Sequence, residues 1–167
     1  MQNETEDLTP TKRELGEKCI KKNMLWSMGA GLIPLPLLDI AAIMGVQLKM
    51  VKELADLYEI PFSENRGKSL ISALLGGMTT HSLNTGIAGS ALKAIPVAGN
   101  ILGFITMPVF SAATSYGLGR VFVQHFESGG TMLTLDPDKM KAYFEAQFRE
   151  GQQTATHMKR RDSVVSA

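Results

Sequence analysis

The sequence is poor in the residues from which disulfide scaffolds and metal sites are built. Its 167 residues include one cysteine and three histidines. A single cysteine excludes an intramolecular disulfide and any zinc site that needs several cysteines. The histidines show no metal-ligand spacing with one another or with nearby carboxylates. We therefore predict no metal and no cofactor.

The sequence also lacks an excess of charge of either sign. Lysine and arginine number 17, aspartate and glutamate number 16, and the net charge is +1. Proteins that bind nucleic acid through bulk charge are strongly basic. The balance argues against that class, and we predict no nucleic-acid partner.

Charged residues are nearly absent from two long stretches. Residues 24–48 hold one, Asp39, and residues 69–126 hold two, Lys93 and Arg120. A helix on the surface of a soluble protein normally carries a charged face. These stretches cannot supply such a face, so we expect them to lie in a protein core or in a bilayer.

Proline and glycine divide the chain into helices, and no run of alternating β-branched residues indicates a strand. We expect helices over about 11–31, 37–58, 64–93, 100–126 and 137–150, with Pro108 as a kink in the fourth. The first and second helices, and the third and fourth, would form two proline-tipped hairpins. The residues that we expect to set hairpin geometry are Pro34, Pro36, Asp39, Pro96 and Gly99.

The predicted fold class is all-α: a membrane-associated helical bundle of two hairpins and a C-terminal amphipathic helix. Its predicted parts are a disordered lead (1–10), a hairpin domain (11–130, with hairpins 11–59 and 64–126), the amphipathic helix (131–151) and a basic flexible tail (152–167).

Length favours membrane insertion, whereas local polarity opposes it. Each arm of the second hairpin is about 24–26 residues with almost no charge, and about 20 residues cross a bilayer. A polar cluster in the third helix suits a helix packed inside a bundle, or one that lines a polar path. Its members are Thr79, Thr80, His81 and Asn84. Small residues that allow close helix packing favour homo-oligomers; they include Gly86, Gly103, Gly117 and Gly119.

Basic residues flank the charge-poor stretches on both sides. They either contact anionic lipid headgroups or are simply solvated; they are Lys18, Lys21, Lys22, Lys159, Arg160 and Arg161. Trp26 is either an interface anchor or a core residue. The three charge-rich segments, residues 1–23, 49–68 and 127–167, all carry lysine or arginine. Both hairpins are therefore expected to enter from the cytoplasmic side.

No set of catalytic residues can be assembled from the sequence. Arg66 to Ser69 imitates the end of a phosphate-binding loop, but Phe62 stands where that loop requires its first glycine. Cys19 has no base nearby in the sequence that could activate it. We predict that the chain is not an enzyme.

Five short motifs together resemble a known family. They are LIPLPLLDI at 32–40, QLKM at 47–50, LADLY at 54–58, KAIPVAG at 93–99 and YGLG at 116–119. The chain resembles the YcjF-like, GTPase-associated family (domain of unknown function 697) over about residues 24–130. The resemblance implies a bacterial, helical, membrane-bound protein that is often encoded beside a small GTPase.

The predicted function is that of a non-enzymatic membrane protein at the cytoplasmic face of the cell membrane. It would oligomerise and anchor or recruit a partner, such as a separately encoded small GTPase, or remodel the membrane. One alternative is an oligomeric pore whose channel is lined by the polar cluster of the third helix. The other is a soluble helical interaction module.

Overall fold

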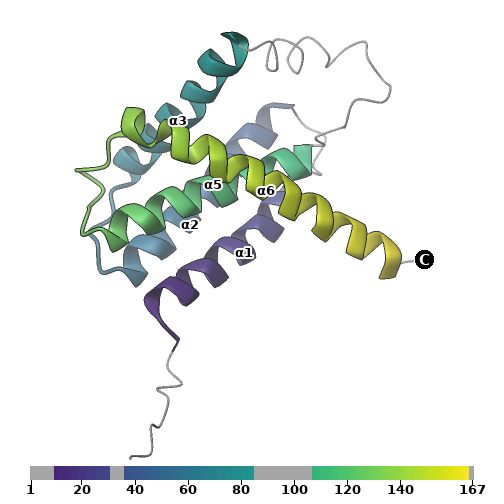
Figure 1. Cartoon of the computed structure of the whole chain (residues 1–167), viewed down its shortest axis with the longest axis horizontal. Coiled ribbons are helices and arrows are strands. Elements are labelled where there is room, and N and C mark those ends of the chain that lie inside the picture. The colour runs from purple at the N-terminus through teal and green to yellow at the C-terminus, as the bar shows by residue number, and fades with distance from the viewer. Residues whose placement is uncertain (1–9, 31–35, 85–106, 166–167) are drawn as a thin grey trace, which may run out of the picture.

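The computed structural model describes residues 10–30, 36–84 and 107–165, and no strand occurs in these ranges. The five helices described in these ranges are α1 (Lys12–Ala30), α2 (Pro36–Leu57), α3 (Glu64–Asn84), α5 (Met107–Glu127) and α6 (Pro137–Val165) (Figure 1). The prediction of an all-α fold is confirmed for the residues that the structure describes.

The helices begin at capping residues that the sequence carries. Thr11 and Glu14 form a reciprocal capping box at α1: the Glu14 N–H donates to Thr11 Oγ1 (3.2 Å), and the Thr11 N–H donates to Glu14 Oε2 (2.9 Å). Asp136 accepts a hydrogen bond from the Asp138 N–H (3.1 Å) at the start of α6. Pro137 occupies the first helical position there, which suits its fixed φ and missing N–H.

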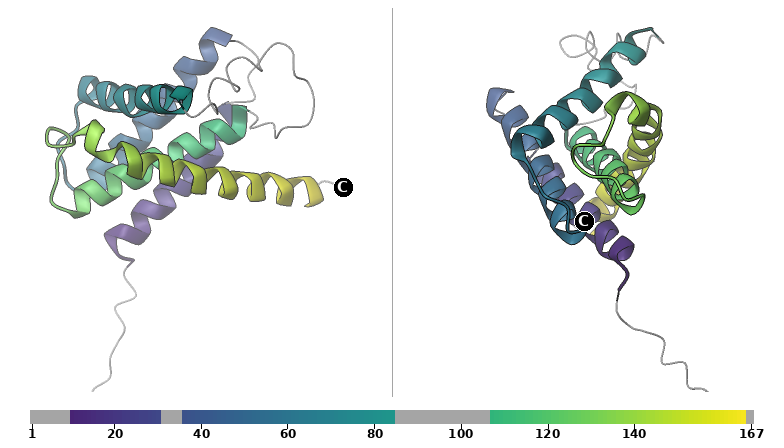
Figure 2. Two further views of the ribbon diagram at one scale, coloured as in Figure 1. Left: turned by 45° about the horizontal axis from the view of Figure 1, so that its top comes forward. Right: turned by 90° about the vertical axis from the view of Figure 1, so that its left-hand side faces the viewer.

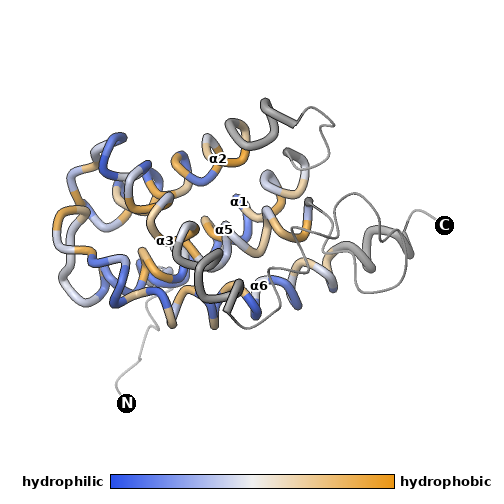
Figure 3. Tube along the Cα trace, turned by 90° about the horizontal axis from the view of Figure 1, so that it is seen from above, coloured by the Kyte–Doolittle hydropathy of each residue, from blue (hydrophilic) through white to orange (hydrophobic). Residues whose placement is uncertain are grey.

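Helix α5 lies at the centre of the bundle. It packs against α1, α2 and α6, and Figure 3 shows α2 and α6 on opposite sides of it. Most residues between 109 and 123 are buried, so this part of the charge-poor stretch forms protein core. The largest fully buried side chains around it include Ile20, Met24, Leu54, Leu118, Phe122 and Phe144.

Within the described ranges, no helix combines the length and the apolarity needed to cross a bilayer. The expectation of two long apolar arms included residues 85–106, which lie outside those ranges.

The second hairpin, predicted over 64–126, is not a packed helix pair in the described structure. Helix α3 lies instead against α6 and α2 (Figure 2). Arg66 near the start of α3 contributes to this placement, together with the buried Leu70, Ile71 and Leu74. Its guanidinium donates to the carbonyl oxygens of Met132 (3.1 Å), Leu133 (3.4 Å) and Leu135 (3.4 Å) in the loop between α5 and α6. These bonds fix the start of α3 to that loop.

Pro108 does not kink the helix in which we expected it. It lies in the first turn of α5, which begins at Met107 in the described structure. The first turn tolerates proline because an N–H there has no partner within the helix.

Helix α6 is longer than predicted. We expected an amphipathic helix over 131–151 and a flexible tail over 152–167, but the helix spans Pro137–Val165. Gly151 and Ala155 are both buried, one turn apart on the side that faces the core. The contact face therefore continues past the predicted end, and small residues keep it close-packed.

Replacing Gly151 by alanine is expected to destabilise the fold by about 1–2 kcal/mol, because overpacking outweighs the gain in helix propensity. A Cβ atom there would lie 2.8 Å from Tyr116 Cβ and 3.0 Å from Ala113 Cα, on the facing helix α5. Gly45→Ala in α2 is the matched control, since its Cβ would meet nothing within 4 Å. That control should stabilise by about 0.5–1 kcal/mol. Urea denaturation measures both, and equal effects would contradict the close α5–α6 contact.

Candidate functional site

Ion pairs gather at one end of the bundle. The start of α1 meets the end of α2 through Lys12 and Glu59 (3.0 Å), and the end of α5 through Arg13 and Glu127 (3.6 Å). The Tyr58 hydroxyl also donates to Glu127 (3.2 Å). We name this the charged end: the starts of α1, α3 and α6 with the ends of α2 and α5. Most other ion pairs of the described residues lie in these segments, namely Lys52–Asp56, Lys68–Glu64, Arg120–Glu17, Lys139–Asp136 and Lys141–Asp138.

The opposite end of the bundle carries little charge, apart from the end of α6, which runs past it (Figure 1). It is formed by the end of α1 and the starts of α2 and α5 (Figure 1), and we name it the charge-poor end. Leu25 and Trp26 are 53% and 63% exposed there. Asp39 is the one charged residue between 24 and 48. Two neighbouring exposed apolar side chains at the edge of this end make it a candidate binding face.

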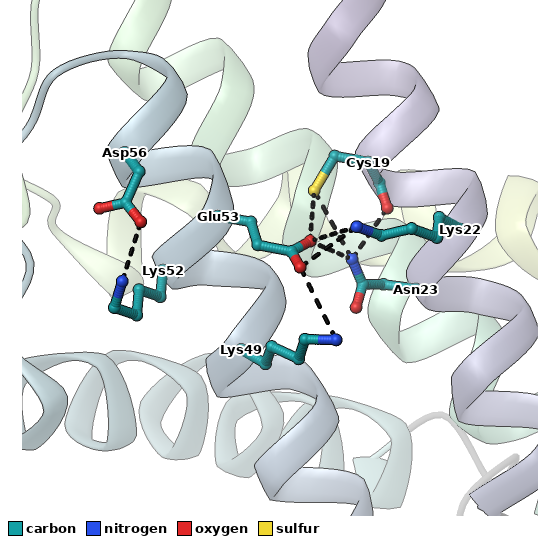
Figure 4. Close-up of polar contacts among 7 residues, drawn as sticks. All are labelled: Cys19, Lys22, Asn23, Lys49, Lys52, Glu53 and Asp56. Carbon is teal, nitrogen blue, oxygen red and sulfur yellow. Dashed lines mark hydrogen bonds and ion pairs between the residues drawn. The ribbon is translucent and has the colours of Figure 1, made fainter.

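Between the two ends, a second group of polar side chains ties α1 to α2, and we name it the Glu53 cluster (Figure 4). The Glu53 carboxylate accepts hydrogen bonds from the Asn23 amide (3.0 Å) and the Cys19 thiol (3.2 Å). It also pairs with the ammonium groups of Lys22 (3.0 Å) and Lys49 (3.7 Å). Burial pushes the pKa of Glu53 upward, but the hydrogen bonds from Asn23 and Lys22 outweigh it, so the pKa is lowered overall.

Cys19 acts in this cluster as a hydrogen-bond donor to Glu53. Burial, together with the hydrogen bond to Glu53 and the charge of that residue, raises the pKa of the thiol to about 12. Nucleophilic and metal-binding chemistry needs the thiolate, which is scarce at neutral pH with such a pKa. The cluster therefore holds two helices together and gives no support to catalysis.

Buried polar side chains line the contacts of α1, α2 and α5 nearer the charge-poor end. Ser27 on α1 and Ser115 on α5 share a hydrogen bond of 2.5 Å. Gln47 on α2 and Ser111 on α5 are fully buried. Both amide atoms of Gln47 and the Ser111 hydroxyl lack a hydrogen-bond partner in the described structure. Such groups weaken the packing that contains them.

The motif at residues 66–69 has a structural role. It lies in the first turns of α3, where Arg66 binds loop carbonyls and Lys68 pairs with Glu64 (2.6 Å). His125 lies close to the Thr131 carbonyl oxygen (3.0 Å), just after α5 ends. No group of three potential metal ligands occurs among the residues that the structure describes.

The predicted packing glycines that the structure describes lie at helix contacts within the chain. A Cβ at Gly117 would lie 2.8 Å from Phe144 on α6, and one at Gly119 would lie 2.5 Å from Ile20 on α1. The remaining predicted packing and hairpin positions outside the described ranges are Pro34, Gly86, Pro96, Gly99 and Gly103.

Several predicted positions lie in helices whose side chains are not described there. Pro36 and Asp39 lie in the first turn of α2, and Thr79, Thr80, His81 and Asn84 lie in the last part of α3. Lys159, Arg160 and Arg161 lie near the end of α6, which continues beyond the other helices (Figure 1). Lys18, Lys21 and Lys22 are exposed on α1.

Sequence reasoning missed three features of this region. Glu53 and Asn23 were not singled out, because their meeting depends on how two helices pair across 30 residues of sequence. Gln47 was quoted only as part of a motif, although a lone amide in a charge-poor stretch is a usable signal. Trp26 was left between anchor and core, and its exposure now decides against the core.

Comparison with known proteins places the chain in a family. No solved structure matches it. It is 40% identical over 162 residues to Magnetosome membrane protein 22 of Magnetospirillum gryphiswaldense, an alignment that covers 94% of this chain and 83% of that protein. The model of the family described as Domain of unknown function (DUF697) matches residues 2–153. The chain therefore belongs to this family, as its motifs predicted.

Proposed function

We propose that the chain is a non-enzymatic, membrane-associated helical protein whose charge-poor end faces the bilayer. The observation that carries the proposal is the separation of charge along the bundle. Seven of the nine ion pairs of the described residues lie at or toward the charged end, and the other two lie between the ends. Leu25 and Trp26 are exposed toward the charge-poor end. Moving an ionised side chain out of water is costly, whereas burying exposed apolar surface is favourable.

The related protein supports the same location at a membrane. It is named as a magnetosome membrane protein, and the two chains align over almost the whole of this one. We extend membrane association to this chain on that ground together with the polarity of the bundle. The raised pKa of the Cys19 thiol supports a role other than catalysis.

The proposal includes a partner at the charged end. With the charge-poor end in the membrane, the charged end would face the cytoplasm and be free to bind a second protein. A separately encoded small GTPase is the partner that the family resemblance suggests, and self-association into an oligomer is the other. Pull-down of the full chain with its genomic neighbours, and its mass in detergent, test these two points.

The pore remains a separate prediction. The residues that would line it are Thr79, Thr80, His81 and Asn84, whose side chains the structure does not describe. Conductance of the full chain in planar bilayers, changed by His81→Ala, would favour the pore over an anchor.

Flotation with vesicles tests membrane association. The full chain is expected to float with liposomes, and Leu25→Glu is expected to weaken this by about tenfold or more, since a carboxylate replaces an apolar contact. Leu133→Glu is the matched control, because Leu133 is a 78% exposed leucine at the charged end. Circular dichroism verifies that both variants fold. A wild-type chain that stays out of the lipid fraction, or equal loss in both variants, would contradict the proposal.

A further inference from the structure

The exposed side of α1 changes from basic to apolar within about two turns. Lys18, Lys22, Leu25, Trp26 and Gly29 are all exposed. Their spacing of three and four residues places them along one side of the helix. Toward the charge-poor end, this side therefore presents ammonium groups first, then leucine and tryptophan, and then glycine.

Helix α2 adds a cation at the point where the exposed side of α1 changes from basic to apolar. The Lys49 ammonium of α2 lies 5.8 Å from the centre of the Trp26 ring, a distance typical of a cation–π contact. Lys22 and Lys49 share one carboxylate, that of Glu53. The three groups together therefore keep a net charge of +1 beside the tryptophan.

Two more cations on this part of α1 lack an acidic partner. Lys18 and Lys21 are exposed and form no ion pair with any residue that the structure describes. The two nearest preceding acids on α1 are engaged elsewhere, Glu14 in the capping box and Glu17 with Arg120 (2.9 Å). Lys21 also borders a hollow lined by Glu17, Arg120 and Glu150, where the charges of both signs balance. The excess positive charge of this surface therefore lies mainly on the side of Lys18, Lys22 and Lys49, although the whole chain is nearly neutral.

We infer that these residues form a site for anionic phospholipid headgroups at the boundary of the bilayer. The site consists of Trp26, Lys18, Lys21, Lys22 and Lys49, and we name it the boundary site. It rests on the proposed function and adds to it the depth of docking and the lipid chemistry. Tryptophan prefers the membrane–water interface, and lysine ammonium groups attract lipid phosphates just outside it.

The order of residues fixes the orientation of the bundle. The lysines would lie at headgroup level, the Trp26 ring at the interface, and the charge-poor end beyond it toward the acyl chains. Lys49 and the tryptophan come from different helices, so the site needs α1 and α2 to be paired. The Glu53 cluster supplies that pairing and holds Lys22 and Lys49 beside each other.

The single tryptophan of the chain makes the site directly measurable. Vesicles of phosphatidylcholine mixed with phosphatidylglycerol are titrated into the full chain, and pure phosphatidylcholine vesicles serve for comparison. The emission of Trp26 is expected to shift to shorter wavelength and to become protected from aqueous acrylamide. Affinity is expected to be higher for the anionic vesicles.

Charge variants test the lysines without disturbing the Glu53 cluster. Lys18→Gln with Lys21→Gln removes two unpaired cations, and we expect roughly 25-fold weaker binding to anionic vesicles, about fivefold for each. Lys68→Gln with Lys139→Gln makes the same charge change at the charged end and should leave binding nearly unchanged.

The outcomes separate this inference from the proposed function. A chain that binds neither kind of vesicle contradicts both. A chain that binds while Trp26 stays accessible to acrylamide overturns the boundary site alone. So does equal affinity for both lipid compositions, or equal weakening by the two double variants, since bulk charge would then explain the binding.

Discussion

Replacing Gln47 by leucine is expected to stabilise the folded chain by about 2–4 kcal/mol, since each buried unpaired polar group costs about 1–3 kcal/mol. The Gln47 side chain is fully buried, and neither of its amide atoms has a hydrogen-bond partner in the described structure. Leucine keeps a similar volume and removes both polar atoms. The denaturation midpoint measured in urea should rise with little change in the slope of the transition.

Gln124→Leu is the control for this prediction. Gln124 is exposed on α5, and a surface change of this kind should alter stability by no more than about 0.5 kcal/mol. If Gln47→Leu destabilised the chain instead, Gln47 would have to make hydrogen bonds that the described packing lacks. The predicted gain also means that glutamine at position 47 lowers the free energy needed to separate α2 from α5 near the charge-poor end, relative to leucine.

Replacing Glu53 by glutamine is expected to destabilise the fold by about 1.5–3 kcal/mol, the usual contribution of hydrogen bonds to a charged group. The variant removes the charge that Lys22 and Lys49 share and leaves the Cys19 thiol facing an amide. Asp56→Asn is the matched control on the same helix (Figure 4). Asp56 pairs with Lys52 alone at an exposed site, so its loss should cost less than about 0.5 kcal/mol.

Comparing wild type with Glu53→Gln at several pH values should reveal how the stability contributed by the Glu53 cluster depends on pH. The folded-state pKa of Glu53 lies below its ordinary value of 4.5. The carboxylate therefore contributes its full stabilisation above about pH 4.5 and loses it as the pH falls through the folded-state pKa. The stability difference between wild type and Glu53→Gln should be constant near neutral pH and shrink in acid. A difference that grew in acid would contradict the claim that the ionised Glu53 carboxylate stabilises the fold.

Local chemistry made much of the fold predictable. Thr11, the Asp136–Pro137 pair and the proline positions are local signals, and each predicted a helix start close to the observed one. The contribution of Glu14 to the capping box of α1 was not predicted. The charge-poor stretch 69–126 was expected to lie in a core or in a bilayer, and most of its residues between 109 and 123 are buried in the described structure.

Long-range pairing was not predictable from the same signals. Hairpin reasoning joined the third and fourth predicted helices because they are consecutive and equally apolar. Helix α3 packs on α6 and α2 instead. Arg66 supports this packing through a loop more than 60 residues away, and nothing in the local pattern marks that arginine. The predicted tail over 152–167 failed for a related reason: its polar residues conceal Ala155, which is buried only because α6 keeps its contact face past Gly151.

The most direct test of the account is amide hydrogen exchange of the full chain with and without anionic vesicles. If the charge-poor end docks on the membrane, vesicles should slow exchange in peptides from the end of α1 and the start of α2, within residues 24–48. Peptides from the charged end, such as residues 58–68 and 127–136, should exchange at the same rate in both samples. Protection confined to the charged end, or spread evenly over the bundle, would contradict the claim that the charge-poor end docks on the membrane.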